Sequence, residues 1–203
     1  MIFYEAGRHR DAGLAHDPFK ALVAPRPIGW VSTMSDDGQV NLAPYSFFNA
    51  IGEAPPMLAF SSKGAKDSAT FAGELREFVW NLVTFELREQ MNATSAPLPR
   101  GHSEFDRAGL QMAPSRLVAP PRVAAARCAM ECMVTHAVEL KDVNGRPADQ
   151  HLVIGQVVGI HLDDAAIVDG AVDTVRLRPV ARLGGPAEYT AVDEVFRMTR
   201  PTE

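Results

Sequence analysis

The stretch RPIGWVSTMSDDGQVNLAPYSFF, from Arg26 to Phe48, contains the clearest fold signal in this sequence. Residues 28–34 form a β-branched and aromatic run typical of a strand, and residues 35–38 form a polar turn whose Gly38 can adopt a positive φ. Residues 39–42 then return as a second strand, which we expect Pro44 to end because proline removes a ladder hydrogen bond. The segment predicts an antiparallel hairpin.

Further short strands and a few helices follow this hairpin. The pattern of apolar residues and turn signals predicts strands over residues 57–61, 77–84, 123–140, 151–162 and 175–180, and helices over residues 67–75 and 86–93. Asp142-Val143-Asn144-Gly145 supplies the turn of a long hairpin. With no repeat or linker, residues 1–203 are expected to form one domain, with a core of about residues 18–200. The expected fold class is mostly β, a sheet curled into a barrel with peripheral helices.

The composition and charge of the chain indicate which class of partner it binds. The chain has 203 residues, 46% of them hydrophobic and 22% charged, with a formal net charge of −5. Scattered basic residues and a negative balance argue against nucleic acid or an anionic membrane surface and favour a small-molecule partner. Residues 1–20 lack the apolar core of a signal peptide, and no segment is apolar enough to span a membrane, so we expect a cytoplasmic protein.

Sulfur and imidazole groups give no sign of a metal or redox centre. Cys128 and Cys132 are four residues apart in a predicted strand, so both side chains are expected on one face as buried free thiols rather than as a disulfide. The six histidines are spread singly, which disfavours a metal site. Motifs of the Rossmann, P-loop, zincin and serine-hydrolase types are absent. A nicotinamide cofactor is therefore not expected to be held by a Rossmann domain.

Two segments could carry a ligand. The polar loop over residues 61–68 combines hydroxyls, a lysine and a predicted helix start, which suits a phosphate, although an ordinary surface loop before a helix would look the same. After Pro44, unpaired backbone N–H groups could bind a ligand. Alternatively, Tyr45, Phe47 and Phe48 could pack into the core or a subunit contact.

Taken together, these segments resemble the flavin reductase-like, FMN-binding split-barrel family, of flavin reductase component and flavoredoxin type. The resemblance covers roughly residues 18–200. The matching motifs are RPIGWVST at residues 26–33, NLAPYSFF at 41–48, PPM at 55–57, Ser61-Ser62, Lys66-Asp67-Ser68, EFVWN at 77–81, Ser103-Glu104-Phe105, Glu131-Cys132, IGQVVGIH at 154–161, RLGG at 182–185 and Tyr189. The third residue of the family's Lys-Asp-Thr motif is Ser68 here, which keeps the hydroxyl.

The resemblance implies a six-stranded antiparallel split barrel that forms a homodimer with FMN at or near the dimer interface. By position, the flavin ring and ribityl chain would contact Ser32, Thr33, Ala43, Pro44, Tyr45 and Ser46. The phosphate end would contact Ser61, Ser62, Lys66, Asp67 and Ser68. Arg26 and Asn81 are additional expected contacts.

The activity implied is an oxidoreductase in which NADH or NADPH passes hydride to flavin N5 and electrons go on to free flavin or a partner monooxygenase. Because the flavin performs the difficult step, no catalytic residue is assigned. His161 and Tyr189 are candidates for placing the nicotinamide, each with an equally good structural role. The alternatives are a non-catalytic FMN-binding electron carrier and a relative of haem-binding or pyridoxamine-phosphate-type oxidases.

Overall fold

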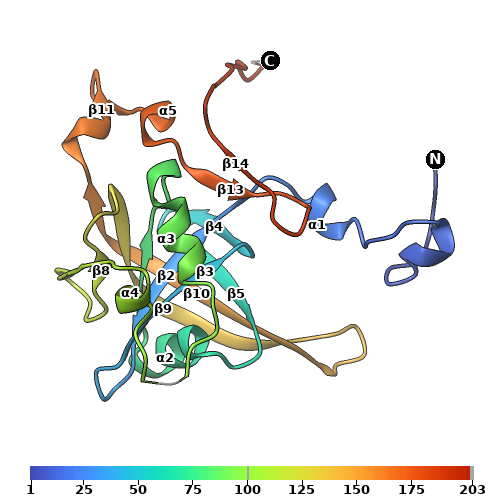
Figure 1. The fold of residues 1–203 in the computed structure, drawn as a ribbon, viewed down its shortest axis with the longest axis horizontal. Coiled ribbons are helices and arrows are strands. Elements are labelled where there is room, and N and C mark those ends of the chain that lie inside the picture. Colours follow the sequence, from blue (N-terminus) through green and yellow to red (C-terminus); the bar gives the residue numbers. More distant parts are fainter. Residues whose placement is uncertain (100, 202–203) are drawn as a thin grey trace.

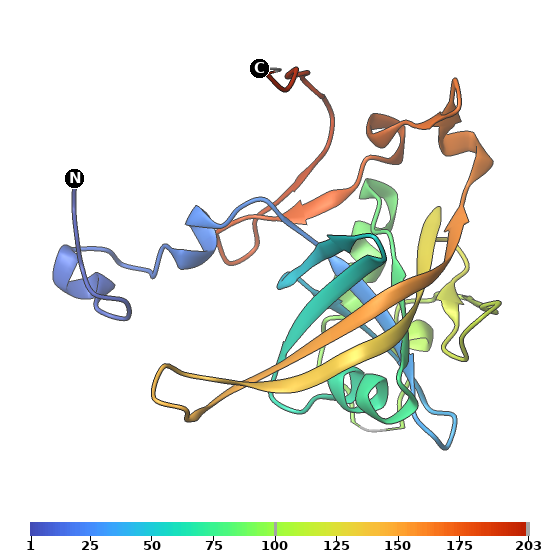
Figure 2. The same ribbon diagram turned by 180° about the vertical axis from the view of Figure 1, so that it is seen from behind.

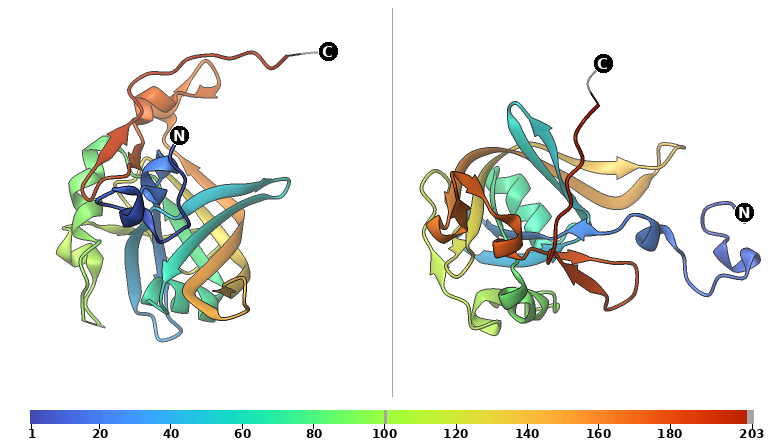
Figure 3. Two further views of the ribbon diagram at one scale, coloured as in Figure 1. Left: turned by 90° about the vertical axis from the view of Figure 1, so that its right-hand side faces the viewer. Right: turned by 90° about the horizontal axis from the view of Figure 1, so that it is seen from above.

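The computed structural model, described over residues 1–99 and 101–201, is built on a seven-stranded antiparallel sheet in the order β3-β2-β6-β9-β10-β5-β4. The edge strands β3 and β4 are separated in sequence by only Ser46 and Phe47, so the sheet curls until its two edges approach each other (Figure 1, Figure 3). The strands are β2 (Gly29–Met34), β3 (Val40–Tyr45), β4 (Phe48–Glu53), β5 (Pro56–Lys63), β6 (Glu77–Asn81), β9 (Cys128–Lys141) and β10 (Pro147–Leu162).

Smaller elements surround this sheet. The short strands form three groups: β1 (Arg26–Pro27) with β13 (Val180–Arg182) and β14 (Tyr189–Ala191), β7 (Met112–Ala113) with β8 (Arg122–Val123), and β11 (Ile167–Val168) with β12 (Ala171–Val172). The helices are η1 (His9–Ala12), α1 (Phe19–Leu22), α2 (Asp67–Leu75), η2 (Phe85–Leu87), α3 (Arg88–Ala93), α4 (Glu104–Arg107), η3 (Asp164–Ala166) and α5 (Thr174–Leu177). None of the described helices is long and apolar enough to cross a membrane.

The long hairpin of β9 and β10 extends well beyond the barrel, and both termini lie on the opposite side from α2 (Figure 2). The Asp142 N–H donates to the Arg146 carbonyl at 2.8 Å and closes the hairpin turn, in which Gly145 has a φ of 78°. Glycine adopts such a positive φ without strain, which suits it to this turn.

Alternating side chains of the curled sheet fill the barrel. Phe60 and Phe78 meet edge to face with ring centroids 5.4 Å apart, and Ala69 and Ala72 of α2 pack against the same core cluster. A second cluster lies between β2 and the helices α3 and α4, where Trp30 is fully buried and its indole N–H donates to Thr94 Oγ1 at 3.0 Å. Strand β2 is therefore covered on both faces, which holds the neighbouring strand β3 in place.

The prediction of a mostly β split barrel with peripheral helices is confirmed, whereas the expected count of six strands is not, because the main sheet has seven. Helix α2 and the long hairpin lie where the sequence predicts them. Cys128 and Cys132 are both buried and free, as expected.

Three local predictions are wrong. Pro44 does not end the second strand: it pairs opposite Trp30 within β3, which is tolerated because β3 is an edge strand. Strand β4 was missed because its outward residues are mostly exposed and lack a strong apolar pattern. Residues 175–180 do not form one strand, since α5 ends at Leu177 and Arg178 adopts a left-handed φ of 47° before β13.

Candidate functional site

A cavity of about 490 Å³ lies between the end of β3 and the start of α2. Strand β3 contributes Ala43, Pro44 and Tyr45, and the helix start contributes Lys66, Asp67 and Ser68. The segment after α3, residues 94–98, and Glu104 form the opposite wall. The β3–α2 cavity thus brings together six of the residues predicted to contact flavin, from segments more than twenty positions apart in the sequence.

Hydroxyl, amide and carboxyl groups form part of the wall of this cavity. Asn41 Nδ2 donates to Ser68 Oγ at 2.6 Å, and both residues are buried. Burial raises the pKa of the Tyr45 phenol, against an opposing effect of hydrogen bonding with Ser68 and Ser62. Burial likewise raises the pKa of Glu104, whose carboxylate accepts the Leu42 N–H at 3.1 Å. Tyr45 therefore stays a neutral donor at physiological pH.

The start of α2 supplies the cationic and N–H groups that a phosphate needs. Lys66 is the N-cap residue, is exposed, and has an extended backbone with ψ of 162° that leads into the helix. The first turn of any helix leaves backbone N–H groups without partners inside the helix, and its dipole favours an anion there. Lys66 and Ser68 flank this position.

Three more predicted hydroxyls lie on neighbouring strands outside the cavity lining. Ser61 Oγ donates to Gln150 Oε1 at 3.0 Å, and Ser62 Oγ approaches the Gly64 carbonyl at 3.4 Å. Thr33 Oγ1 is buried and has no hydrogen-bond partner among the described residues. Among these three hydroxyls, Thr33 Oγ1 is therefore the one whose hydrogen-bonding capacity no described residue uses.

Ser32 and Asn81, by contrast, hydrogen-bond within the protein interior. Ser32 Oγ donates to the Pro121 carbonyl at 2.5 Å, while Asn81 donates to the Trp30 carbonyl at 3.1 Å and accepts the Val123 N–H at 2.8 Å. Both side chains are fully buried. These bonds tie β2 and β6 to β8 and to the residue before it.

Arg26 and Ser46 line a different cavity, of about 780 Å³, beside α1 and residues 182–186. The Arg26 guanidinium donates to the carbonyls of Val23 at 2.8 Å, Leu183 at 2.9 Å and Lys20. It therefore joins the N-terminal segment to the residues after β13. Its hydrogen bonds run to backbone carbonyls of the chain itself.

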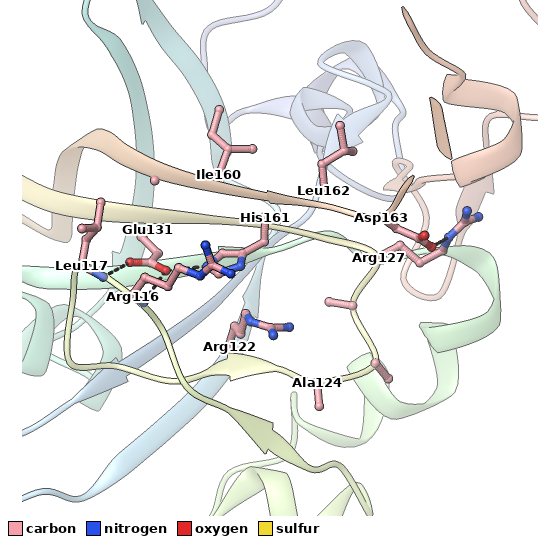
Figure 4. Close-up of a pocket in the computed structure, with 13 residues that line it drawn as sticks. Arg116, Leu117, Arg122, Ala124, Arg127, Glu131, Ile160, His161, Leu162 and Asp163 are labelled. Atoms are coloured by element: carbon pink, nitrogen blue, oxygen red, sulfur yellow. Dashed lines mark hydrogen bonds and ion pairs between the residues drawn. The ribbon is translucent and has the colours of Figure 1, made fainter. Parts of the chain in front are cut away.

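His161 and Tyr189 do not line the β3–α2 cavity either, and each lines a different cavity. His161 Nε2 lies 2.5 Å from Oε1 of the fully buried Glu131 (Figure 4). Tyr189 packs under Arg182, whose guanidinium carbon is 4.6 Å from the ring centroid and whose Nη1 donates to the phenol oxygen at 2.6 Å. Within one chain, these two candidates do not meet the six residues of the β3–α2 cavity.

Sequence reasoning missed the cluster around His161. Arg116, Arg122 and Glu131 surround it in a cavity of about 690 Å³ (Figure 4). These residues come from a loop, the short strand β8 and the long strand β9, so no spacing pattern connects them. Only the fold places them together.

Comparison with known proteins assigns the family. The family model described as flavin reductase like domain matches residues 22–175. An uncharacterized protein of Halalkalibacterium halodurans is 40% identical over 185 residues, covering 89% of this chain and 88% of the relative. The chain belongs to the flavin reductase-like domain family.

Two solved structures share the whole architecture. Nitrilotriacetate monooxygenase component B from Bacillus cereus aligns with a TM-score of 0.88 at 29% identity, covering 98% of each chain. The 2-nitrobenzoate 2-nitroreductase of Pseudomonas fluorescens aligns with a TM-score of 0.81 at 28% identity, covering 94% of each chain. Both support a flavin reductase-like split barrel for this protein.

Proposed function

We propose that this protein binds FMN with its phosphate at the start of α2, and that it reduces the flavin with NADH or NADPH. The observation that carries this proposal is the β3–α2 cavity, where Lys66 and Ser68 lie at a helix start beside the neutral polar wall of β3. Family membership supports the flavin, and the cavity supports its position.

The chemistry of the cavity fits FMN. Lys66 would balance phosphate charge, the Ser68 hydroxyl would donate to a phosphate oxygen, and the helix dipole would favour the dianion. Ala43, Pro44 and the Tyr45 side chain would lie along the flavin ring and ribityl chain. Thr33 Oγ1 has an unsatisfied hydrogen-bonding capacity that the flavin or ribityl group would use.

The work of the protein would be positioning rather than acid–base catalysis. When bound, FMN supplies the capacity to accept a hydride and to pass electrons onward. The chain would keep the flavin edge in contact with neutral donors, since burial keeps the Tyr45 phenol protonated. A fixed, partly apolar wall would also limit water at the reacting edge.

The electron acceptor in this proposal is free flavin or a partner monooxygenase. The likeness to a monooxygenase component B supports a partner oxygenase.

A homodimer in the cytoplasm is also part of the proposal. Its support is the set of large apolar side chains exposed on the sheet, Ile51, Met133, Val138, Leu140 and Ile160. Light scattering during size-exclusion chromatography would measure the dimer.

The test is an anaerobic visible spectrum of the FMN-reconstituted protein before and after addition of NADH, then of NADPH. We expect loss of the flavin band near 450 nm at a catalytic rate with at least one nucleotide. Bound flavin that neither nucleotide reduces would instead identify an electron carrier. Failure to bind FMN at all would contradict the proposal.

A further inference from the structure

The cavity around His161, of about 690 Å³, lies at the open end of the β9–β10 hairpin, away from the hairpin turn. Its walls are the loop before β8, residues 124–127 and the end of β10. It shares no lining residue with the β3–α2 cavity. Figure 4 shows Arg116, Arg122, Arg127 and His161 around it. We call it the arginine cavity.

The acidic groups of the arginine cavity are already engaged. Arg127 Nε contacts Asp163 Oδ2 at 2.7 Å, and Arg127 Nη1 donates to the Arg176 carbonyl at 3.0 Å. Glu131 accepts the N–H groups of Arg116 at 2.8 Å and Leu117 at 2.6 Å, besides its contact with His161. Glu131 thus fixes the backbone of the loop that carries Arg116.

Two arginine side chains of the cavity have no acidic partner among the described residues. Among the described residues, neither the Arg116 nor the Arg122 side chain makes a hydrogen bond or an ion pair with another residue. Arg122 Nε is moreover buried without an acceptor. Buried N–H donors in folded proteins nearly always have a partner. An anion in this cavity would balance the charge of the two arginines and accept hydrogen bonds from their guanidinium groups.

The cavity is larger than a small inorganic ion needs. Its volume of about 690 Å³ lies within the range of sites that take organic ligands, and the exposed Leu117 is part of its lining. A small inorganic ion would leave most of that volume to water. An organic anion would place its charged end on the arginines and fill the rest of the cavity with its body.

From this arrangement we propose that the arginine cavity binds a phosphate-bearing organic anion at a site separate from the proposed flavin site. Two planar guanidinium forks match the several oxygens of a phosphate or diphosphate. The phosphate could belong to a nicotinamide nucleotide or to a phosphorylated acceptor. Both would present the same chemistry to Arg116 and Arg122.

The experiment is calorimetric titration of the purified protein with ADP and with inorganic phosphate, first without and then with saturating FMN. We expect ADP to bind more tightly than inorganic phosphate, and FMN to leave ADP affinity unchanged. Arg122→Ala should weaken ADP binding by about tenfold or more, since charge-assisted hydrogen bonds to phosphate are lost. Arg116→Ala, which alters an exposed side chain and so avoids a folding defect, should weaken it in the same direction.

Arg146→Ala, at the exposed tip of the β9–β10 hairpin, is the matched control and should bind ADP normally. ADP binding no tighter than inorganic phosphate would overturn the proposal, as would unchanged affinity in both the Arg122 and Arg116 variants. Displacement of ADP by FMN would overturn the separateness of the two sites. ADP is first titrated without FMN, so the ADP affinity can be interpreted even if the protein does not bind FMN.

Competition with oxidised nucleotides then identifies the source of the phosphate. Displacement of ADP by NAD⁺ or NADP⁺ would support a nicotinamide nucleotide as the occupant. Persistent ADP binding in their presence would support a phosphorylated acceptor.

Discussion

The β3–α2 cavity and the arginine cavity differ in the groups that they offer to an anion. The first combines one exposed lysine and a helix start with hydroxyl groups, whereas the second gathers arginines around a buried carboxylate. Two short runs of neighbouring residues, 43–45 and 66–68, supply the predicted contacts of the first cavity, whereas the arginines of the second come singly from separate segments. The comparison teaches that a cavity can be recognised from the sequence only where neighbouring residues carry its chemistry.

The two cavities also differ in how far their polar groups support the fold, and Glu131→Ala should reveal this most strongly. The substitution leaves the Arg116 and Leu117 N–H groups and His161 without their carboxylate, so we expect a loss of about 3–5 kcal/mol in the free energy of unfolding. Urea unfolding measures it. Glu139→Ala, on the exposed part of the same strand, is the control. A loss below about 1 kcal/mol would show that Glu131 does not organise the arginine cavity.

The matching substitution in the β3–α2 cavity is Asn41→Ala, which removes the donor to Ser68 Oγ. A neutral hydrogen bond is involved, so the expected loss is about 1–2 kcal/mol in urea unfolding. FMN affinity should fall together with stability, because Ser68 loses the contact that orients it. A loss as large as that of Glu131→Ala would remove the contrast between the two cavities.

Acid should act on the arginine cavity first through Glu131. Burial opposes ionisation of this carboxyl, but hydrogen bonds from His161 and from the Arg116 and Leu117 N–H groups outweigh it and lower its pKa below 4.5. The stabilisation is then complete above the ordinary pKa and is lost as pH falls through the lower folded value. We expect unfolding free energy to fall more steeply between about pH 5 and 3 in the wild type than in Glu131→Gln. Parallel curves would contradict this assignment.

The smallest expected effect concerns the rates at which the two thiols react. Cys132 lies in the barrel interior and Cys128 near its end, so the two rates compare these regions. Burial raises the pKa of both cysteines, and much further for Cys132 in the barrel than for Cys128 near Arg127. Since the thiolate is the reactive form, a thiol reagent at pH 8 should modify Cys128 slowly and Cys132 only after unfolding. Mass spectrometry of Cys128→Ser and Cys132→Ser variants assigns each rate. Faster modification of Cys132 would contradict the packing described.

Much of the fold could be predicted because local signals agree with the structure. The hairpin before Pro44, helix α2 and the long hairpin each have turn residues and periodicity of their own. Strand β4 could not be predicted, because it depends on pairing with β5 rather than on its own composition. The continuation of β3 through Pro44 depends on the edge position of that strand, which is a property of the whole sheet.

The candidate site also has residues whose placement the sequence predicts and residues whose placement it does not. Lys66, Ser68 and Tyr45 were expected to share a site, and the fold brings them to one cavity. Ser32 and Asn81 resemble ligand contacts in sequence, yet their hydrogen bonds reach β8 and the residue before it, which no local pattern reveals. Arg116 and Arg122 were missed because isolated arginines carry no signal until the loop around them is placed.

The most direct test of the account is a comparison of FMN with riboflavin, which differs by the phosphate, on the wild type, Lys66→Ala and the control Lys141→Ala. We expect the wild type and the control to bind FMN more tightly, and Lys66→Ala to lose about tenfold in FMN affinity with little change for riboflavin. Fluorescence quenching measures each affinity. Equal binding of FMN and riboflavin by the wild type, or an unchanged preference in Lys66→Ala, would contradict the placement of the flavin phosphate at the start of α2.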